Sequence, residues 1–157
     1  MAIEHDAIPN AELHEPKGVS AASSGQVYVA NGSGSGVWTT KNYYDKVYLY
    51  CHHDNLDTPT SHYVVSPVAG TITKIYSVID AAIALADTTL VTKIGGVTVT
   101  NGTITIAYSG SAAGDVDSCT PTALNSVSAG TAIEIASGGE TNTSGAHAHI
   151  TIEITRS

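Results

Sequence analysis

The chain has few charged residues and very few basic ones. Charged side chains make up 13% of its 157 residues, Lys and Arg together number six, and the formal net charge is −8. No cluster of basic residues occurs in the sequence, so the electrostatic footprint of a protein that binds nucleic-acid phosphates is absent. We therefore expect no nucleic-acid partner.

The sequence also lacks a long apolar run. A membrane-spanning helix needs about 20 mostly apolar residues in a row, and the apolar stretch at residues 78–90 is interrupted by Asp80 and Asp87. The acidic residues 1–12 lack the apolar segment of a secretory signal. We expect a protein that folds in a cytoplasm and has no membrane partner.

Cysteine is scarce, because Cys51 and Cys119 are the only two. Thiols stay reduced in a cytoplasm. We therefore expect two free thiols, with a disulfide between them as the alternative.

Short polar residues, mainly Thr, Ser, Gly and Asn, replace the missing charge, while 42% of the residues are hydrophobic, which suffices for a core. Runs of alternating apolar and polar residues, separated by turn-forming residues, predict about eight β-strands. They lie at residues 45–51, 62–66, 71–79, 89–94, 97–99, 103–108, 131–137 and 146–155. These strands, and the long connections between some of them, predict an all-β domain at residues 42–157. We expect an antiparallel, jelly-roll-like β-sandwich.

Turn and helix signals refine this prediction. The dipeptides Gly95-Gly96 and Asn101-Gly102 each predict a hairpin turn. Residues 109–120 are expected to form a long loop. Only residues 80–87 and 122–125 are compatible with a short helical turn, with a loop as the alternative.

The last predicted strand alternates most regularly. Ala148, Ile150, Ile152 and Ile154 share one face, and His147, His149, Thr151, Glu153 and Thr155 share the other. The aliphatic face is expected to point into the core. The histidine face should then point away from it.

The histidines are the candidates for metal binding. Two His residues that are two apart on a strand are a workable half of a metal site, and a nearby loop with His52 and His53 could complete His147 and His149. Because the His face points away from the core, the pattern favours exposed polar residues over metal ligands. We expect no metal and no cofactor, and these four residues are the candidates should a metal bind.

No catalytic arrangement can be recognised in the sequence. Asp115 and Asp117 could form half of a Ca²⁺ site, but Ca²⁺ takes six to eight oxygen ligands and their loop offers few others. No nucleophile elbow, phosphate-binding loop, Ser-His-Asp order or zinc signature occurs. We expect no catalytic residues and a protein that is not an enzyme.

Residues 1–41 are expected to form an extended N-terminal arm. Pro16 marks a turn, residues 26–30 form a short strand, and residues 31–36 form a Gly- and Ser-rich tip before Trp38. Aromatic residues supply much of the binding energy in protein interfaces. The candidate partner-binding residues are Leu13, Pro16, Tyr28 and Trp38, and strand 26–30 could add to the edge of a partner sheet. The alternative is a tail whose one strand joins the chain's own β domain.

Two parts of the sequence carry a resemblance. The segments LHEPKG at residues 13–18 and GQVYVANGSGSGVW at residues 25–38 resemble an N-terminal module of virion proteins of tailed bacteriophages, especially proteins that decorate the head. Residues 63–155 are similar to small β domains of phage structural proteins. The resemblance implies a non-enzymatic homotrimer on the capsid exterior, assembled in the host cytoplasm. It also implies that the arm contacts the major capsid protein and that the β domain projects outward. His147 and His149 depart from the aliphatic pattern usual at the end of such domains.

The first functional hypothesis is therefore a decoration or cement protein that stabilises the capsid. The alternative is a receptor- or carbohydrate-binding domain of a phage head or tail fibre, with Tyr43, Tyr44, Tyr48 and Tyr50 stacking on host surface glycans. Against this alternative, half of these tyrosines are expected to be core or interface residues. A hydrolase of cell-surface polymers is a third hypothesis, which the lack of paired carboxylates disfavours.

Overall fold

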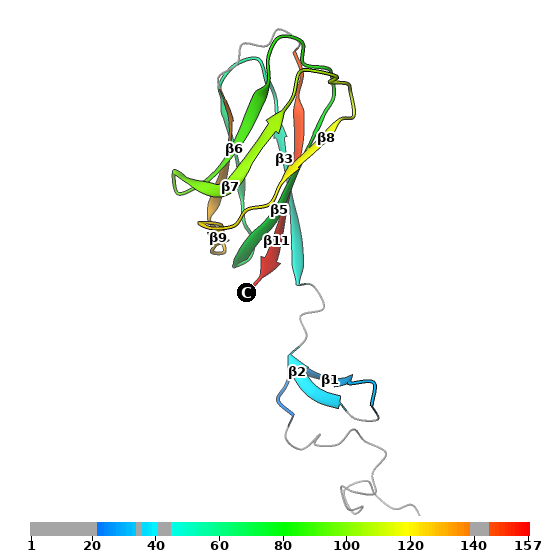
Figure 1. Cartoon of the computed structure of the whole chain (residues 1–157). Coiled ribbons are helices and arrows are strands. Elements are labelled where there is room, and N and C mark those ends of the chain that lie inside the picture. The colour runs from blue at the N-terminus through cyan, green and yellow to red at the C-terminus, as the bar shows by residue number, and fades with distance from the viewer. Residues whose placement is uncertain (1–21, 34–35, 41–44, 139–144) are drawn as a thin grey trace, which may run out of the picture. The chain divides into compact units, whose positions relative to one another are not determined.

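The computed structural model describes residues 22–33, 36–40, 45–138 and 145–157. These residues fall into two compact units, one within residues 1–43 and one within residues 44–157 (Figure 1). No helix occurs among the described residues, and every pair of neighbouring strands there runs antiparallel. The prediction of an all-β, antiparallel protein is confirmed.

The first unit contains a hairpin of β1 (Gln26–Ala30) and β2 (Gly36–Thr40). Tyr28 lies opposite Trp38, and their rings meet edge to face with centres 5.3 Å apart. A side chain at Gly36 would overlap the Tyr28 ring, so glycine is needed there. The sequence predicted β1 but not β2. The second strand begins within the Gly- and Ser-rich segment 31–36, which has no alternating apolar pattern. β1 therefore pairs with its own hairpin partner rather than with the sheets of the second unit.

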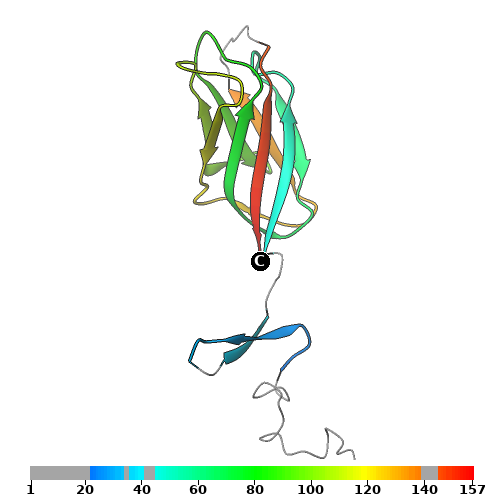
Figure 2. The same cartoon turned by 90° about the vertical axis from the view of Figure 1, so that its right-hand side faces the viewer.

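The described part of the second unit contains nine strands. They are β3 (Lys46–His53), β4 (Ser61–Val65), β5 (Gly70–Ile79), β6 (Thr88–Ile94), β7 (Val97–Ile106), β8 (Val116–Cys119), β9 (Ser126–Val127), β10 (Ala132–Gly138) and β11 (Ala148–Arg156). One sheet has the order β3-β11-β5-β8, with β9 also paired to β5, and the other has the order β4-β10-β6-β7 (Figures 1 and 2).

The pairing is nested around the tight turn at Gly95-Gly96. β6 pairs with β7 across this turn, β5 pairs with β8, β4 with β10, and β3 with β11. Both glycines have positive φ values, 58° and 80°, as the favoured two-residue hairpin turn requires. The hairpin predicted at this dipeptide is confirmed.

One hydrophobic core unites the two sheets. β11 lies between β3 and β5, and its Ile150, Ile152 and Ile154 are fully buried. The cluster around them includes Ile72 and Ile75 from the same sheet. It also includes side chains from the other sheet, namely Leu90, Ile104, Ile106, Ile133 and Ile135. The alternation read from the sequence of β11 is confirmed.

The hairpin predicted at Asn101-Gly102 is wrong. β7 continues through this dipeptide, and Asn101 takes a φ of 56° inside the strand. The register against β6 shifts between Val91 and Lys93, so the dipeptide lies in a bulge rather than a turn. Val99, within the bulged segment, is fully buried, which favours keeping this segment packed on the protein rather than in an exposed turn.

One further segment differs from its prediction, and two others take the alternative that the sequence left open. Residues 109–120, expected to be a loop, contain β8, which pairs with β5 although its own sequence has no apolar face. Residues 80–87 and 122–125 form no helical turn, so the loop alternative holds for both. In the first of these segments Ile83 is buried, and its N–H donates to Ser111 Oγ at 3.0 Å. Tertiary contacts rather than helix propensity decide these conformations.

Truncating the central strand should destabilise the second unit strongly. We expect Ile152→Ala to lower the free energy of unfolding by about 2–5 kcal/mol, because the side chain is fully buried and leaves a cavity. Val116→Ala, at a residue 65% exposed, should change it by less than about 0.5 kcal/mol. Urea unfolding of both variants measures the difference, and equal effects would contradict the assigned core.

Candidate functional site

The outer face of the β3-β11-β5 sheet concentrates aromatic side chains. Because side chains alternate along a strand, burial of Leu49 and Cys51 turns Tyr48 and Tyr50 outward. Tyr76 of β5 lies in the same cross-strand row as Tyr50, since both are paired with Thr151. Tyr48, Tyr50 and Tyr76 are 58%, 60% and 38% exposed. We call these three residues, with His52, His147 and His149, the Tyr–His face.

The carboxylate of Glu153 forms a hydrogen-bond network at one end of this face. Glu153 of β11 is only 8% exposed, yet its oxygens accept hydrogen bonds from Lys46 Nζ at 2.9 Å, Tyr48 Oη at 3.1 Å and Thr73 Oγ1 at 2.7 Å. The Lys46 and Thr73 hydrogen bonds hold the pKa of Glu153 below its ordinary value. The carboxylate is therefore ionised at neutral pH, and it orients Tyr48.

Three histidines gather at the other end. His149 of β11 lies directly opposite His52 of β3, with ring centres 4.7 Å apart. His147, just before β11, places its ring 5.7 Å from that of His52. The sequence predicted that His147 and His149 share a face, and the strand pairing adds His52 to them.

Each of the three rings has an oxygen partner at Nδ1. His147 meets Asp80 Oδ2 at 2.6 Å, and its backbone N–H donates to the other oxygen of Asp80 at 2.8 Å. His52 meets Asp54 Oδ1 at 2.8 Å, and His149 meets the Tyr50 hydroxyl. The hydrogen bonds from His147 lower the pKa of Asp80.

His53, the fourth metal candidate, does not join this group. Adjacent residues of a strand face opposite ways, so His53 points inward and is fully buried against the ring of His62, with centres 4.5 Å apart. Neither of its ring nitrogens has a hydrogen-bond partner among the described residues. Burial, followed by the nearby His62, lowers the pKa of His53 and favours its neutral form. Among the described residues, no group of three or more His, Cys, Asp or Glu side chains is already arranged to hold a metal ion.

Both cysteines are free thiols. Cys51 is buried in the core, and Cys119 is partly buried on β8. Burial raises the pKa of Cys51, and it raises that of Cys119 to about 11. Such thiols are poor nucleophiles at neutral pH.

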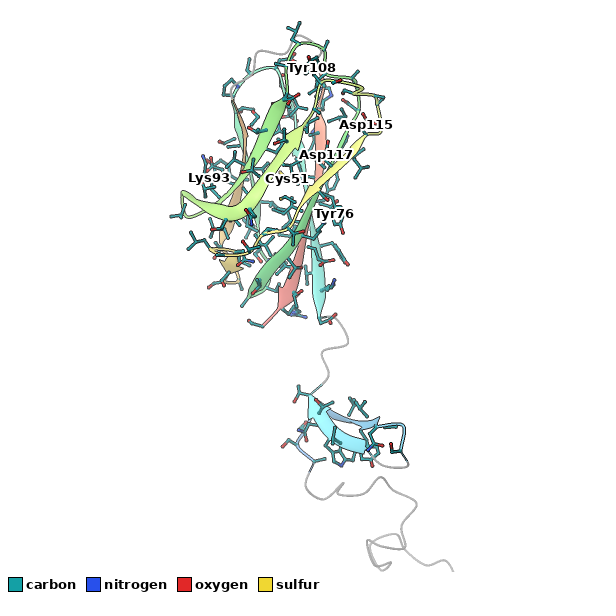
Figure 3. The ribbon with its side chains drawn as sticks, in the orientation of Figure 1. Cys51, Tyr76, Lys93, Tyr108, Asp115 and Asp117 are labelled. Carbon is teal, nitrogen blue, oxygen red and sulfur yellow. The ribbon has the colours of Figure 1, made fainter. Side chains whose placement is uncertain are left out.

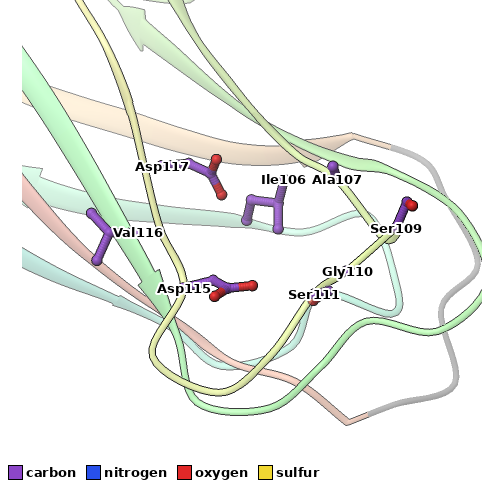
Figure 4. Close-up of a pocket in the computed structure, with 8 residues that line it drawn as sticks. All are labelled: Ile106, Ala107, Ser109, Gly110, Ser111, Asp115, Val116 and Asp117. Atoms are coloured by element: carbon purple, nitrogen blue, oxygen red, sulfur yellow. The ribbon is translucent and has the colours of Figure 1, made fainter.

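A small pocket of about 180 Å³ lies between the end of β7 and the start of β8 (Figure 4). Asp115 and Asp117 line it together with Ile106, Ala107, Ser109, Gly110, Ser111 and Val116. Burial and the charge of Asp115 raise the pKa of Asp117, and Asp115 accepts the N–H of Ala112 at 2.7 Å. Ligand pockets usually measure about 300–1,000 Å³. This pocket is therefore smaller than a typical ligand site. Figure 3 labels Asp117 on β8, the strand next to that of Tyr76, and Asp115 just before β8 begins.

The partner-binding candidates fall into two groups. Tyr28 and Trp38 pair across the hairpin of the first unit, and both are partly buried. Leu13 and Pro16 lie outside the described residues, as do Tyr43 and Tyr44.

No protein-family model matches the chain. No curated protein matches it either. In the described part of the chain, no helix could cross a membrane.

The Glu153 network should contribute to stability in a pH-dependent way. The folded-state pKa of Glu153 is below the unfolded value of about 4.3, so its contribution is present above that pH and is lost as the pH falls through the folded pKa. We expect Glu153→Gln to lower the free energy of unfolding by about 1–2 kcal/mol at pH 7, since half-exposed Lys46 is partly screened by water.

The difference between wild type and Glu153→Gln should be smaller at pH 3 than at pH 7, because the contribution of the carboxylate is lost as the pH falls through its folded-state pKa. Urea unfolding at the two pH values measures it. Tyr48→Phe is the matched control, because it removes one donor and keeps the carboxylate, so its effect at pH 7 should be smaller. A difference that does not change with pH would contradict the ionised state of Glu153.

Proposed function

We propose that this chain is a non-catalytic virion structural protein that decorates and stabilises the capsid of a tailed bacteriophage. In this proposal the second unit is a jelly-roll sandwich displayed on the capsid exterior. The N-terminal arm, including the hairpin, docks on the major capsid protein. The protein would assemble as a homotrimer and lack a cofactor.

The nested strand pairing is the observation that carries the proposal. Leaving out short β9, the first strand of the second unit pairs with its last, the second with the second-last, and so on inward to β6 and β7. A jelly roll is a long antiparallel ribbon wound into two sheets in this order, and the fold is common in viral capsid and lectin domains. A fold does not define a function, so the proposal also rests on the resemblance of the sequence to phage decoration proteins.

The hairpin supports a docking role. A two-stranded hairpin is only marginally stable by itself in water, and no third strand pairs with β1 or β2 among the described residues. Adding a strand from a partner sheet would satisfy an open edge. The Tyr28–Trp38 pair would supply an aromatic anchor of the kind that dominates interfaces. Binding only to the assembled capsid would then stabilise the capsid by linkage.

Removing the hairpin should abolish capsid binding without unfolding the second unit. A chain that begins at residue 44 is expected to keep its unfolding transition but to lose co-sedimentation with capsids that lack the protein. Trp38→Ala in the full chain should weaken binding at least tenfold, whereas Val37→Ala, at a 64% exposed neighbour, should change it little. Undiminished binding of the truncated chain would refute docking through the arm.

A second function, glycan binding, is favoured by the Tyr–His face. Tyr48 and Tyr50 are well exposed on a rigid sheet, and Lys74 lies 5.7 Å from the centre of the Tyr76 ring, next to them. Exposed aromatic rings beside polar groups are suited to stacking on sugars. This would make the chain a receptor- or carbohydrate-binding domain of a head or tail fibre.

A glycan array distinguishes the two functions. If the Tyr–His face binds sugars, the full chain should give signals that Tyr50→Ala reduces at least tenfold. Tyr63→Ala, which removes a 64% exposed tyrosine from the opposite sheet, should retain them. An array without signals above background would remove glycan binding and leave the decoration role unaffected.

A further inference from the structure

The three outward histidines of the Tyr–His face have a common chemical arrangement. His52, His147 and His149 all use Nδ1 for their oxygen partner, and no hydrogen bond to any of their Nε2 atoms occurs within the described part of the chain. All three Nε2 atoms are therefore open to a ligand. The side chains of His52 and His147 are each 41% exposed, so a ligand could approach from solvent.

The oxygen partners determine which nitrogen can bind a metal. An ionised carboxylate only accepts hydrogen bonds, so Asp54 and Asp80 require a proton on Nδ1 of His52 and His147. In the neutral imidazole the lone pair then lies on Nε2. A carboxylate that holds Nδ1–H in this way is the usual outer partner of a metal-bound histidine. The Tyr50 hydroxyl can accept the Nδ1 proton of His149 in the same manner.

The spacing of the His52 ring from each of the other two rings also suits a shared ion. With a zinc–nitrogen distance of about 2 Å and tetrahedral angles, the centres of two zinc-bound imidazoles lie roughly 5 Å apart. The observed separations from His52 are 4.7 Å to His149 and 5.7 Å to His147. The three side chains are not yet arranged around a common point, so the rings must turn for their Nε2 atoms to converge. The side chains of Asp54 and Asp80 are 70% and 41% exposed, so they can move with the rings and keep the Nδ1 contacts while the backbone stays in place.

We propose that His52, His147 and His149 bind one divalent transition-metal ion through their Nε2 atoms on the outer face of the β3-β11-β5 sheet. Imidazole ligands suit Zn²⁺, Ni²⁺ and Cu²⁺. Three neutral imidazoles leave the fourth position of a zinc ion to water. Asp54 and Asp80 act as positioning residues, and their two negative charges offset the charge of the ion. The site joins β3 to the segment that precedes β11, so binding should also stabilise the fold.

Zn²⁺ titration of the full chain tests the proposal. His5 and His14, the two histidines of residues 1–43, are replaced by Gln in every protein used, so that they cannot contribute. Calorimetry at pH 7.5 should give one Zn²⁺ per chain, and the melting temperature should rise with Zn²⁺ concentration. In ¹⁵N spectra of the imidazoles, Zn²⁺ should shift the Nε2 resonances of the three histidines.

Variants separate the proposed site from scattered surface binding. His149→Gln and His52→Gln should each weaken Zn²⁺ binding at least tenfold, and Asp80→Ala should weaken it about 10–100-fold. His62→Gln is the matched control, because His62 packs on the buried His53, and it should bind like the parent. No heat and no rise in melting temperature for the parent would overturn the proposal. So would undiminished binding by His149→Gln or His52→Gln.

Discussion

The burial of one aliphatic row on β11 is the constraint on which the second unit depends. β11 has a strand neighbour on each side, and its Ala148, Ile150, Ile152 and Ile154 are fully buried. Sliding β11 by one residue would expose these four side chains and bury the polar row instead, so the register is strongly determined. The same constraint places His149, Thr151 and Glu153 on the outer face. The Tyr–His face is therefore a direct consequence of how the core is packed.

The two ends of that face use polar groups differently. At the Glu153 end, a nearly buried carboxylate is satisfied by three donors and holds Tyr48 in place. At the histidine end, two carboxylates orient imidazoles and leave their Nε2 atoms open. The face thus combines oriented aromatic rings with open ligand atoms on one sheet, an arrangement that suits the binding proposed for it. The hairpin of the first unit offers a separate surface, built on the Tyr28–Trp38 pair.

Local sequence signals gave wrong predictions of secondary structure where contacts between distant parts of the chain determined the conformation. Asn101-Gly102 is a strong turn signal, but β6 pairs with β7 on both sides of it and buried Val99 holds the strand, so the dipeptide becomes a bulge. β8 has no apolar alternation, and it is a strand only because β5 offers it hydrogen bonds. β2 follows a Gly- and Ser-rich turn and depends on the rings of Tyr28 and Trp38 facing each other. In each case the deciding contact comes from a part of the chain that a short window of sequence does not include.

The sequence by itself determined the all-β class, most of the strands and the inward and outward faces of β11, because alternation in a strand is a local property of the backbone. It also placed His147 and His149 together. Only the tertiary structure decided that His52 joins them while its neighbour His53 is buried against His62. That outcome depends on the pairing of β3 with β11, which are the first and last strands of the unit in the sequence. Strand order arises from the packing of the whole core, so no local pattern of residues contains it.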